Sequence, residues 1–295
     1  MTRLLVVGGG GMLGHKVWQL GQQRFDTWAT VRAVTPAMQA LGLGHPDRTC
    51  VGVDALRFAT VEAALDRAKP DAVVNCVGVI KQLAGAKDPV QSIAINSLFP
   101  HQLARACVAR GARLIHISTD CVFDGSRGGR QQSDAPDAPD LYGRSKALGE
   151  VTGSGGLTLR TSIIGRVLQG ASGLVEWFLS RRGGSADGYR HAVFSGFTTV
   201  ELANIVFRVL EQHPGLEGLY HVSAAPIDKL ALLELLNEAF AAQVSLTPRD
   251  EPHIDRSLDS APFRAATGYE PPTWVDMVRD LAADPTPYES VRALS

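Results

Sequence analysis

Short apolar runs alternate with longer segments of helical period along the first half of the chain. Strands buried on both faces are predicted at Leu4–Val7, Ala72–Cys76, Leu114–Ile117 and Leu157–Leu159. Apolar residues at helical spacing predict helices at Met12–Gln23, Thr60–Ala68, Gln91–Arg110 and Tyr142–Val151. Buried strands separated by helices form βαβ units, whose crossovers are right-handed. We therefore expect an α/β protein with a Rossmann-type, doubly wound parallel sheet.

The alternation becomes less regular after Gly165. Strong patterns return as helices at Thr199–Gln212, Asp228–Ala241 and Trp274–Ala283, with a strand at Leu219–Val222. The chain is long enough for one large core with a smaller lobe attached. We predict a first domain over residues 1–165, which about residues 195–225 rejoin. The rest of residues 166–295 is expected to form mainly a smaller C-terminal α/β lobe.

Composition narrows the function classes. The formal net charge is −1, whereas nucleic acids and anionic membranes bind strongly positive surfaces, so neither partner is expected. The cysteines form no C-x-x-C pair and the histidines show no paired ligand spacing, so we expect reduced thiols and no metal. The apolar start runs into glycines instead of a cleavage site, and no uncharged run is as long as a membrane span. These features predict a cytoplasmic protein.

A glycine-rich loop follows the first predicted strand and precedes the first helix. Its sequence is Gly8-Gly-Gly-Gly11-Met12-Leu13-Gly14. Glycine lets the backbone approach a pyrophosphate closely, and the N–H groups and dipole of the following helix favour phosphate. The alternative is a glycine turn without a ligand, but the strand–loop–helix context favours a dinucleotide site.

A second strand is expected to end near Thr30-Val31-Arg32, and the residues there bear on which dinucleotide binds. An NAD-preferring protein carries an acidic residue near the position of Thr30-Val31-Arg32, and none is present here. Arg32 suits a 2′-phosphate, which favours NADP(H) over NAD(H); the alternative is a solvent-facing arginine. Asp54, after the next strand, either accepts a hydrogen bond from the adenine amino group or caps a helix.

The sequence Tyr142-Gly-Arg-Ser-Lys146 places a phenol and an ammonium on one face of a helix. It follows a predicted strand that ends in Ser118-Thr119-Asp120, and ligands bind at the carboxyl ends of parallel strands. A free phenol has a pKa of about 10, and a nearby cation lowers it. We predict that Tyr142 gives a proton to a substrate carbonyl, that Thr119 orients this carbonyl, and that Lys146 lowers the pKa of Tyr142 and holds the nicotinamide ribose. A structural tyrosine beside a solvated lysine is the alternative.

Together these motifs resemble those of the extended short-chain dehydrogenase/reductases. The matching segments are Gly8–Gly14, Ser118–Gly125, Tyr142–Glu150 and Arg160–Ser162. Within that class the chain is most similar to dTDP-4-dehydrorhamnose reductase and related nucleotide-sugar 4-ketoreductases, from Leu4 to about Leu281. The resemblance implies a Rossmann domain, a C-terminal substrate lobe and an active site between them. It also implies NADPH- or NADH-dependent reduction of the C4 ketone of a 6-deoxy-4-keto nucleotide sugar, in deoxysugar and surface polysaccharide biosynthesis.

The resemblance assigns roles to single positions. The residues that match the family's catalytic set are Thr119, Tyr142 and Lys146. Those that match the loop beneath the cofactor are Asn75, Cys76, Val77 and Gly78. Asn96 falls where relatives have an asparagine on the next helix; alternatively, local hydrogen bonds satisfy it within that helix.

Two positions depart from the family pattern, which leaves the rhamnose-precursor activity itself open. Cys121 stands where the usual reductase has tyrosine, and Ile163 stands where it often has tryptophan. Cys121 is also similar to the cysteine with which GDP-L-fucose synthase epimerises its sugar, and His191 would be its partner acid. Alternatively, Cys121 is a small apolar filler.

Further substrate contacts are predicted in the second half of the chain. Arg160, at a strand end, either pairs with a sugar-nucleotide phosphate or forms a structural salt bridge. Arg256 lies in the segment Asp255–Ser260, which resembles the region where relatives contact substrate but also fits a capped turn. Trp177 is either a ligand platform or a core residue.

Two other functions stand as alternatives to the reductase. An epimerase or dehydratase would use the same tyrosine–lysine pair with its cofactor recycled in place, and net NADPH consumption separates it from a reductase. A regulatory cofactor-binding subunit is the non-catalytic alternative, which the intact Thr119, Tyr142 and Lys146 disfavour. Relatives form dimers, so a homodimer is compatible with the sequence.

Overall fold

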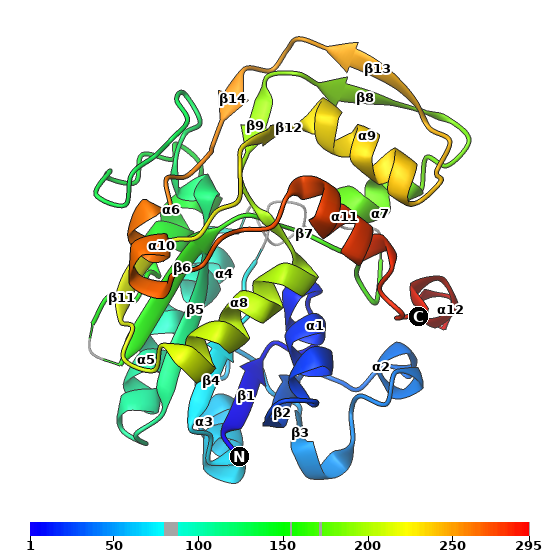
Figure 1. Cartoon of the computed structure of the whole chain (residues 1–295). Helices are drawn as coiled ribbons and strands as arrows, with labels where there is room; N and C mark the ends of the chain where they lie inside the picture. The colour runs from blue at the N-terminus through cyan, green and yellow to red at the C-terminus, as the bar shows by residue number, and fades with distance from the viewer. Residues whose placement is uncertain (80–87, 154, 171–172, 295) are drawn as a thin grey trace.

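A seven-stranded parallel sheet forms the centre of the computed structural model, which describes residues 1–79, 88–153, 155–170 and 173–294 (Figure 1). The strands lie in the order β11-β6-β5-β4-β1-β2-β3, and all neighbouring pairs are parallel. Their bounds are β1 Arg3–Val7, β2 Asp26–Val31, β3 Thr49–Val51, β4 Ala72–Asn75, β5 Arg113–Thr119, β6 Gly156–Thr161 and β11 Gly218–His221. The predicted α/β class and doubly wound parallel sheet are confirmed.

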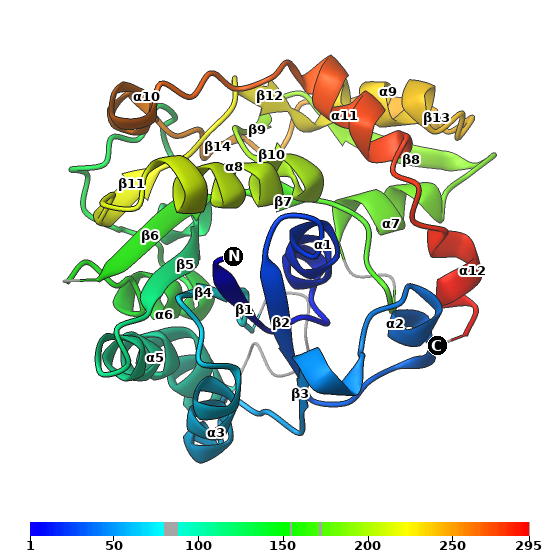
Figure 2. The same ribbon diagram turned by 60° about the horizontal axis from the view of Figure 1, so that its bottom comes forward.

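Helices cover both faces of this sheet (Figure 2). Alternate residues of β1 point to opposite faces, so Leu4 and Val6 pack in one apolar cluster and Leu5 and Val7 in another. The first cluster includes residues of α1 (Met12–Gly21) and α8 (Thr199–Gln212). The second includes residues of α3 (Phe58–Ala68) and α5 (Phe99–Val108). Continuous apolar strands are therefore explained by burial on both sides.

Two predicted helices differ from the observed ones. The segment predicted as one helix, Gln91–Arg110, comprises α4 (Pro89–Ser92), the π-helix η3 (Ile93–Leu98) and α5. The helix predicted at Tyr142–Val151 is α6 (Leu141–Leu148), which ends earlier. At Gly149 the chain passes so close to η3 that a Cβ atom there would lie 1.8 Å from the carbonyl oxygen of Asn96. This contact between α6 and η3 shapes the site described below.

A smaller lobe covers the carboxyl end of the sheet (top of Figure 1). In it, β8 (Ser185–Tyr189) pairs with β13 (Ser245–Arg249), and β9 (Ala192–Phe194) lies between β12 (Ile227–Asp228) and β14 (Ile254–Asp255). Its helices are α7 (Leu174–Leu179), α9 (Lys229–Ala239) and α11 (Trp274–Ala282), while α10 (Ala261–Thr267) packs on β11 of the main sheet. β7 (Ile163–Ile164) pairs with β10 (Phe197–Thr198). β7 comes directly after β6 of the main sheet, and β10 comes directly before α8, which covers that sheet.

The end of the chain returns to the first helix. α12 (Tyr288–Arg292) lies near α2 (Pro36–Ala40), which precedes the 3-10 turn η1 (Pro46–Arg48) (Figure 2). The buried Lys16 ammonium is 2.5 Å from a carboxylate oxygen of Asp284, and Nε2 of His15 is 2.9 Å from the Tyr288 hydroxyl. One apolar core therefore contains residues from both sides of residue 165.

Three further expectations concern thiols, membrane spans and metals. The four cysteines are free thiols. In the part of the chain that the structure describes, no helix combines the length and apolarity needed to cross a bilayer. Among the same residues, no group of three His, Cys, Asp or Glu side chains is arranged to hold a metal ion.

Candidate active site

The glycine loop between β1 and α1 is folded tightly against both elements. Gly8 has a positive φ of 91°, and a Cβ atom at Gly14 would lie 2.1 Å from the carbonyl oxygen of Gly8. Only glycine fits at Gly14, because the atom it would strike belongs to the backbone. The residue that caps α1, Gly11, has no side chain to accept a hydrogen bond from the helix. The first turn of α1 also contains no acidic residue. The first N–H groups of α1, at Met12 and Leu13, are therefore open to an anion.

The two residues predicted to read the adenosine end have different surroundings. Arg32 is exposed after β2, and its guanidinium forms no ion pair with any residue in the described ranges. Asp54 accepts a hydrogen bond from the N–H of Leu56 at 3.0 Å and lies 3.8 Å from Arg57. The geometry of Asp54 thus matches a capped turn, while Arg32 is left to interact with a ligand.

The loop after β4 is held by two buried asparagines. Asn75 accepts a hydrogen bond from the N–H of Val77 at 3.0 Å and contacts His116 across the sheet. Asn96 accepts from the N–H of Val79 at 2.9 Å and donates to its carbonyl oxygen at 3.1 Å. Asn96 also donates to Oγ of Ser145 in α6 at 3.2 Å. Asn96 therefore ties the 76–79 loop to the helix of Tyr142 and is not satisfied locally.

Thr119, Tyr142 and Lys146 converge at the carboxyl end of β5. Thr119 ends this strand, and its hydroxyl is hydrogen-bonded with Tyr142 of α6. α6 begins at the capping residue Asp140 and packs closely on η4 (Asp120–Val122), where a Cβ at Gly143 would lie 2.2 Å from the carbonyl oxygen of Cys121. Lys146, one turn further, donates to the carbonyl oxygen of Ile117 at 2.8 Å. The small residue next to Tyr142 thus allows the helix to bring the phenol to the strand end.

Burial dominates the electrostatics of this group. It raises the pKa of Tyr142 above its usual value, while the hydrogen bond with Thr119 acts in the opposite direction. Burial also lowers the pKa of Lys146 to about 8, against the nearby charge of Glu150. Burial is the largest influence on the pKa of Tyr142 in this structure, and the lowering effect of Lys146 stays a prediction. A raised pKa makes the phenol a weaker acid, so proton donation by Tyr142 would depend on a nearby cation that stabilises the phenolate.

Two of the predicted substrate residues lie beside this group. Cys121 follows Thr119 by two positions, and its backbone N–H donates to Thr119 Oγ1 at 3.1 Å. Its side chain lies within electrostatic range of Tyr142. Arg256 donates hydrogen bonds to the carbonyl oxygens of Phe123 and Asp124. Its positive charge also acts on the buried Asp120, whose pKa it lowers.

Three other predicted residues make different contacts. Arg160 is buried and donates to both carboxylate oxygens of Glu150, which is the structural salt bridge given above as an alternative to a phosphate contact. Trp177 packs partly buried against the main core, with the Arg181 guanidinium 5.9 Å from its ring. The ring of His191 stacks on that of His253 in the small lobe, with centroids 4.4 Å apart.

Two charged residues near the site were not predicted. Asp120 is buried, and burial raises its pKa. Lys229, the first residue of α9, lies within range of both Asp120 and Cys121. A signal for Lys229 was present in the sequence, because Lys is scarce here and a cation at the start of a helix opposes the helix dipole.

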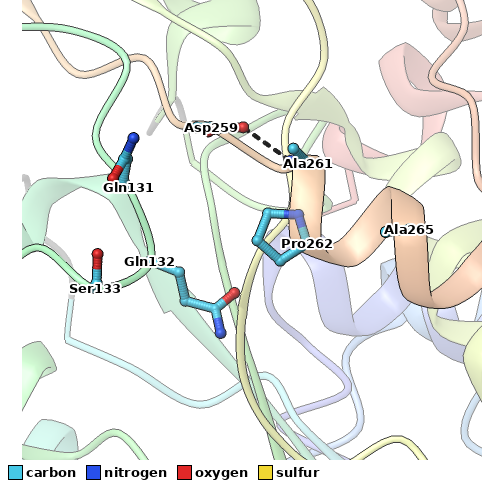
Figure 3. Close-up of a pocket in the computed structure, with 7 residues that line it drawn as sticks. All are labelled: Gln131, Gln132, Ser133, Asp259, Ala261, Pro262 and Ala265. Carbon is cyan, nitrogen blue, oxygen red and sulfur yellow. Dashed lines mark hydrogen bonds between the residues drawn. The ribbon is translucent and has the colours of Figure 1, made fainter.

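A pocket of about 650 Å³ lies apart from these residues (Figure 3). The loop after η4 lines one side of the pocket, and the start of α10 lines the other. Its lining residues are Gln131, Gln132, Ser133, Asp259, Ala261, Pro262 and Ala265. The Asp259 carboxylate caps α10 by accepting from the N–H of Ala261 at 2.8 Å. No residue of the catalytic group lines this pocket, so its size alone does not make it the reaction site.

Comparison with known proteins gives one matching family model and a set of relatives. The model of the RmlD substrate binding domain matches residues 1–284. A dTDP-4-dehydrorhamnose reductase from Streptomyces griseus is 37% identical over 149 residues, which are 50% of this chain and 43% of that protein. A probable dTDP-4,6-dihydroxy-2-methyloxan-3-one 4-ketoreductase from Streptomyces antibioticus is 31% identical over 230 residues, 76% of this chain and 72% of that protein. The match to the S. griseus protein thus spans less than half of its length.

Solved structures share the fold at low sequence identity. A dTDP-4-dehydrorhamnose reductase from Bacillus anthracis in complex with NADP has a TM-score of 0.78 and 18% identity, over 96% of this chain and 99% of that one. The Bordetella bronchiseptica enzyme WbmG in complex with NAD has a TM-score of 0.76 and 18% identity, over 100% of this chain and 96% of that one. At this identity the likeness concerns the fold.

Proposed function

Since the chain belongs to the family of the RmlD substrate binding domain, we propose that it reduces the ketone of a 4-keto-6-deoxy nucleotide sugar with NADPH, and that Tyr142 is the proton donor. The relatives named as a dTDP-4-dehydrorhamnose reductase and as a probable 4-ketoreductase support the reaction class. The product would be a deoxyhexose for a surface polysaccharide, a use supported by a relative from Bacillus subtilis named as a spore coat polysaccharide biosynthesis protein. We assign nucleotide binding to residues 1–165 with about 195–225, and substrate binding mainly to the other C-terminal residues.

One observation carries this proposal. The hydroxyls of Thr119 and Tyr142 meet in a hydrogen bond at the carboxyl end of β5, two strands from the glycine loop that follows β1. A carbonyl oxygen bound beside these hydroxyls would accept from Tyr142, and also from Thr119 once that hydroxyl turns from the Asp120 carboxylate, to which it donates at 3.1 Å. This arrangement is what protonation of a ketone oxygen requires.

The residues around the loop fit a nicotinamide dinucleotide. The open N–H groups at the start of α1 suit its pyrophosphate, and the backbone of Gly8–Gly14 carries no side chain that would block approach. Arg32 would pair with the 2′-phosphate of NADPH, and Lys146 would hold the nicotinamide ribose. When bound, the nicotinamide supplies the hydride that reduces the carbonyl carbon.

The protein's own groups then supply the proton and the orientation. Tyr142 is protonated at neutral pH, as a phenol ordinarily is, and it donates this proton to the ketone oxygen. Burial raises its pKa and makes it a weaker acid, so the transfer depends on stabilisation of the phenolate. Thr119 orients the same oxygen. The ammonium of Lys146, whose pKa is about 8, stabilises the phenolate that remains after the transfer.

The test is NADPH consumption with a panel of 4-keto-6-deoxy nucleotide sugars, followed by absorbance. We expect substrate-dependent oxidation that falls by about 10²–10⁴-fold in Tyr142→Phe, the contribution typical of a general acid. The matched control is Tyr220→Phe, since Tyr220 is only partly buried and contacts Phe263 through its ring. The dissociation constant for NADPH should be the same in all three proteins. A parent protein that binds NADPH but reduces no sugar would contradict the proposal, and sugar conversion without NADPH loss would favour an epimerase.

A further inference from the structure

Lys229 has an unusual position for a lysine. It is the first residue of α9 in the small lobe, directly after the capping residue Asp228. Its side chain is partly buried, and Nζ lies 3.6 Å from the centroid of the Phe194 ring of β9. A positive charge at the start of a helix opposes the helix dipole, so local structure does not favour lysine here.

The Lys229 ammonium has no hydrogen-bond partner among the residues that the structure describes, and no carboxylate of these residues is within ion-pair distance. Among the described residues, the ammonium makes a cation–π contact with the Phe194 ring. Burial lowers its pKa to about 8, and the charges of Asp120 and Cys121 raise the pKa only in part. An ammonium has three N–H donors and no acceptor, so a ligand that replaces water around it must present acceptor atoms.

Lys229 belongs to the small lobe, but the charges that act on it belong to the residues after β5. Asp120 and Cys121, the groups within its electrostatic range, are the two residues directly after Thr119. The N–H of Cys121 donates to the Thr119 hydroxyl, which is hydrogen-bonded with Tyr142. The ammonium, which belongs to the small lobe, is therefore within electrostatic range of the two residues that follow the proposed ketone site.

We propose that Lys229 is the contact of the small lobe with the hexose of the substrate, and that its ammonium donates hydrogen bonds to a sugar oxygen beside the reacting ketone. This inference rests on the proposed function, because it presumes a ketosugar held by Thr119 and Tyr142. A sugar oxygen would accept from donors that bond to no described residue, at a place within electrostatic range of Cys121. The nucleotide of the same substrate would bind elsewhere and would not depend on Lys229.

The experiment compares the parent protein with Lys229→Met, Lys229→Arg and Lys69→Met. Methionine keeps the apolar stem without the charge, and arginine restores a cationic donor. Lys69 is exposed at the end of α3, so its replacement controls for the loss of one positive charge. Steady-state kinetics give KM and kcat for the reduced sugar. Calorimetry gives dissociation constants for NADPH, for the product nucleotide sugar and for its free nucleoside diphosphate.

We expect Lys229→Met to raise KM and the product dissociation constant by about tenfold or more, the loss expected for a hydrogen bond from a charged group. kcat should change much less, since the contact is already made in the bound ground state. The affinities for NADPH and for the nucleoside diphosphate should be unchanged. Lys229→Arg should recover most of the loss, and Lys69→Met should match the parent.

Each other result has a distinct meaning. An unchanged KM in Lys229→Met overturns the inference while leaving the reductase in place. A parallel loss of NADPH and nucleoside diphosphate binding also overturns it, because Lys229 would then support the fold and not the sugar. A parent protein that neither binds nor reduces any nucleotide sugar contradicts the proposed function and this inference together.

Discussion

Replacing Glu150 by glutamine tests whether one buried carboxylate supports both the sheet and the proposed catalytic lysine. Glu150 accepts hydrogen bonds from Nε and Nη2 of Arg160 at 2.7 and 2.6 Å and from Oγ of Ser118 at 2.7 Å. The side chains of Arg160 and Glu150 are 5% and 6% exposed, so water cannot compensate for the lost charge. The charge of Glu150 also raises the pKa of Lys146 against the larger effect of burial.

The expected loss of stability follows from this burial. Removing one partner of a buried ion pair destabilises a protein by about 3–5 kcal/mol, because the other charge stays desolvated. Glutamine keeps one acceptor oxygen, so we expect the lower end, about 3 kcal/mol. At about 2 °C per kcal/mol for a chain of this size, the thermal midpoint should fall by about 6 °C.

A second effect is expected on the pH dependence of turnover. Without the charge of Glu150, the pKa of Lys146 should fall below its value of about 8. If the proposed reaction needs the charged ammonium, activity is lost as the pH rises through this pKa. The alkaline limb of the kcat profile should therefore move to lower pH in Glu150→Gln.

Circular dichroism measures the thermal midpoint, and NADPH oxidation measures kcat against pH. The matched control is Glu211→Gln, which removes a carboxylate paired with Arg24 at the surface, where the exposed fractions are 32% and 40%. Such a pair contributes at most about 1 kcal/mol. Equal midpoints in the two variants would refute the burial argument. An alkaline limb that does not move would refute the coupling between Glu150 and Lys146.

Two further predictions concern the cofactor. Gly14→Ala should weaken NADPH binding and lower the free energy of unfolding by about 1–3 kcal/mol, since the new Cβ would lie 2.1 Å from a backbone oxygen. The control Gly215→Ala places a Cβ with no atom within 4 Å, so calorimetry and thermal unfolding should show no change. Arg32→Ala should raise KM for NADPH about tenfold and leave KM for NADH unchanged, and an equal effect on both would exclude a 2′-phosphate contact.

The sequence alone predicted the elements whose signals are local. The apolar strands and the helical period of Thr199–Gln212 depend on neighbouring residues, and α8 has the predicted bounds. The glycine loop and the spacing of Tyr142 and Lys146 are likewise local, because a strand end or one turn of helix fixes them. These motifs were sufficient to predict the parallel sheet and to select Thr119, Tyr142 and Lys146 as the candidate catalytic group.

The small lobe was the part of the fold that sequence patterns described least well. Its strands have two to five residues, too few for a clear alternation. They also pair across long separations, as β8 does with β13, where Ser185 faces Ser245. Pairing partners so distant in the chain leave no mark in the pattern of either segment.

Tertiary structure alone decided what surrounds the candidate catalytic group. Burial is the largest influence on the pKa of Tyr142, and burial depends on every element packed around the phenol. The guanidinium of Arg160 is a group that commonly binds phosphate, but here it is buried and paired with Glu150. Lys229 is within electrostatic range of the residues after Thr119 because the small lobe covers the carboxyl end of the sheet. The sequence determined which chemical groups are present, whereas the packing of distant segments decided which of them meet, because burial and charge act through space and not along the chain.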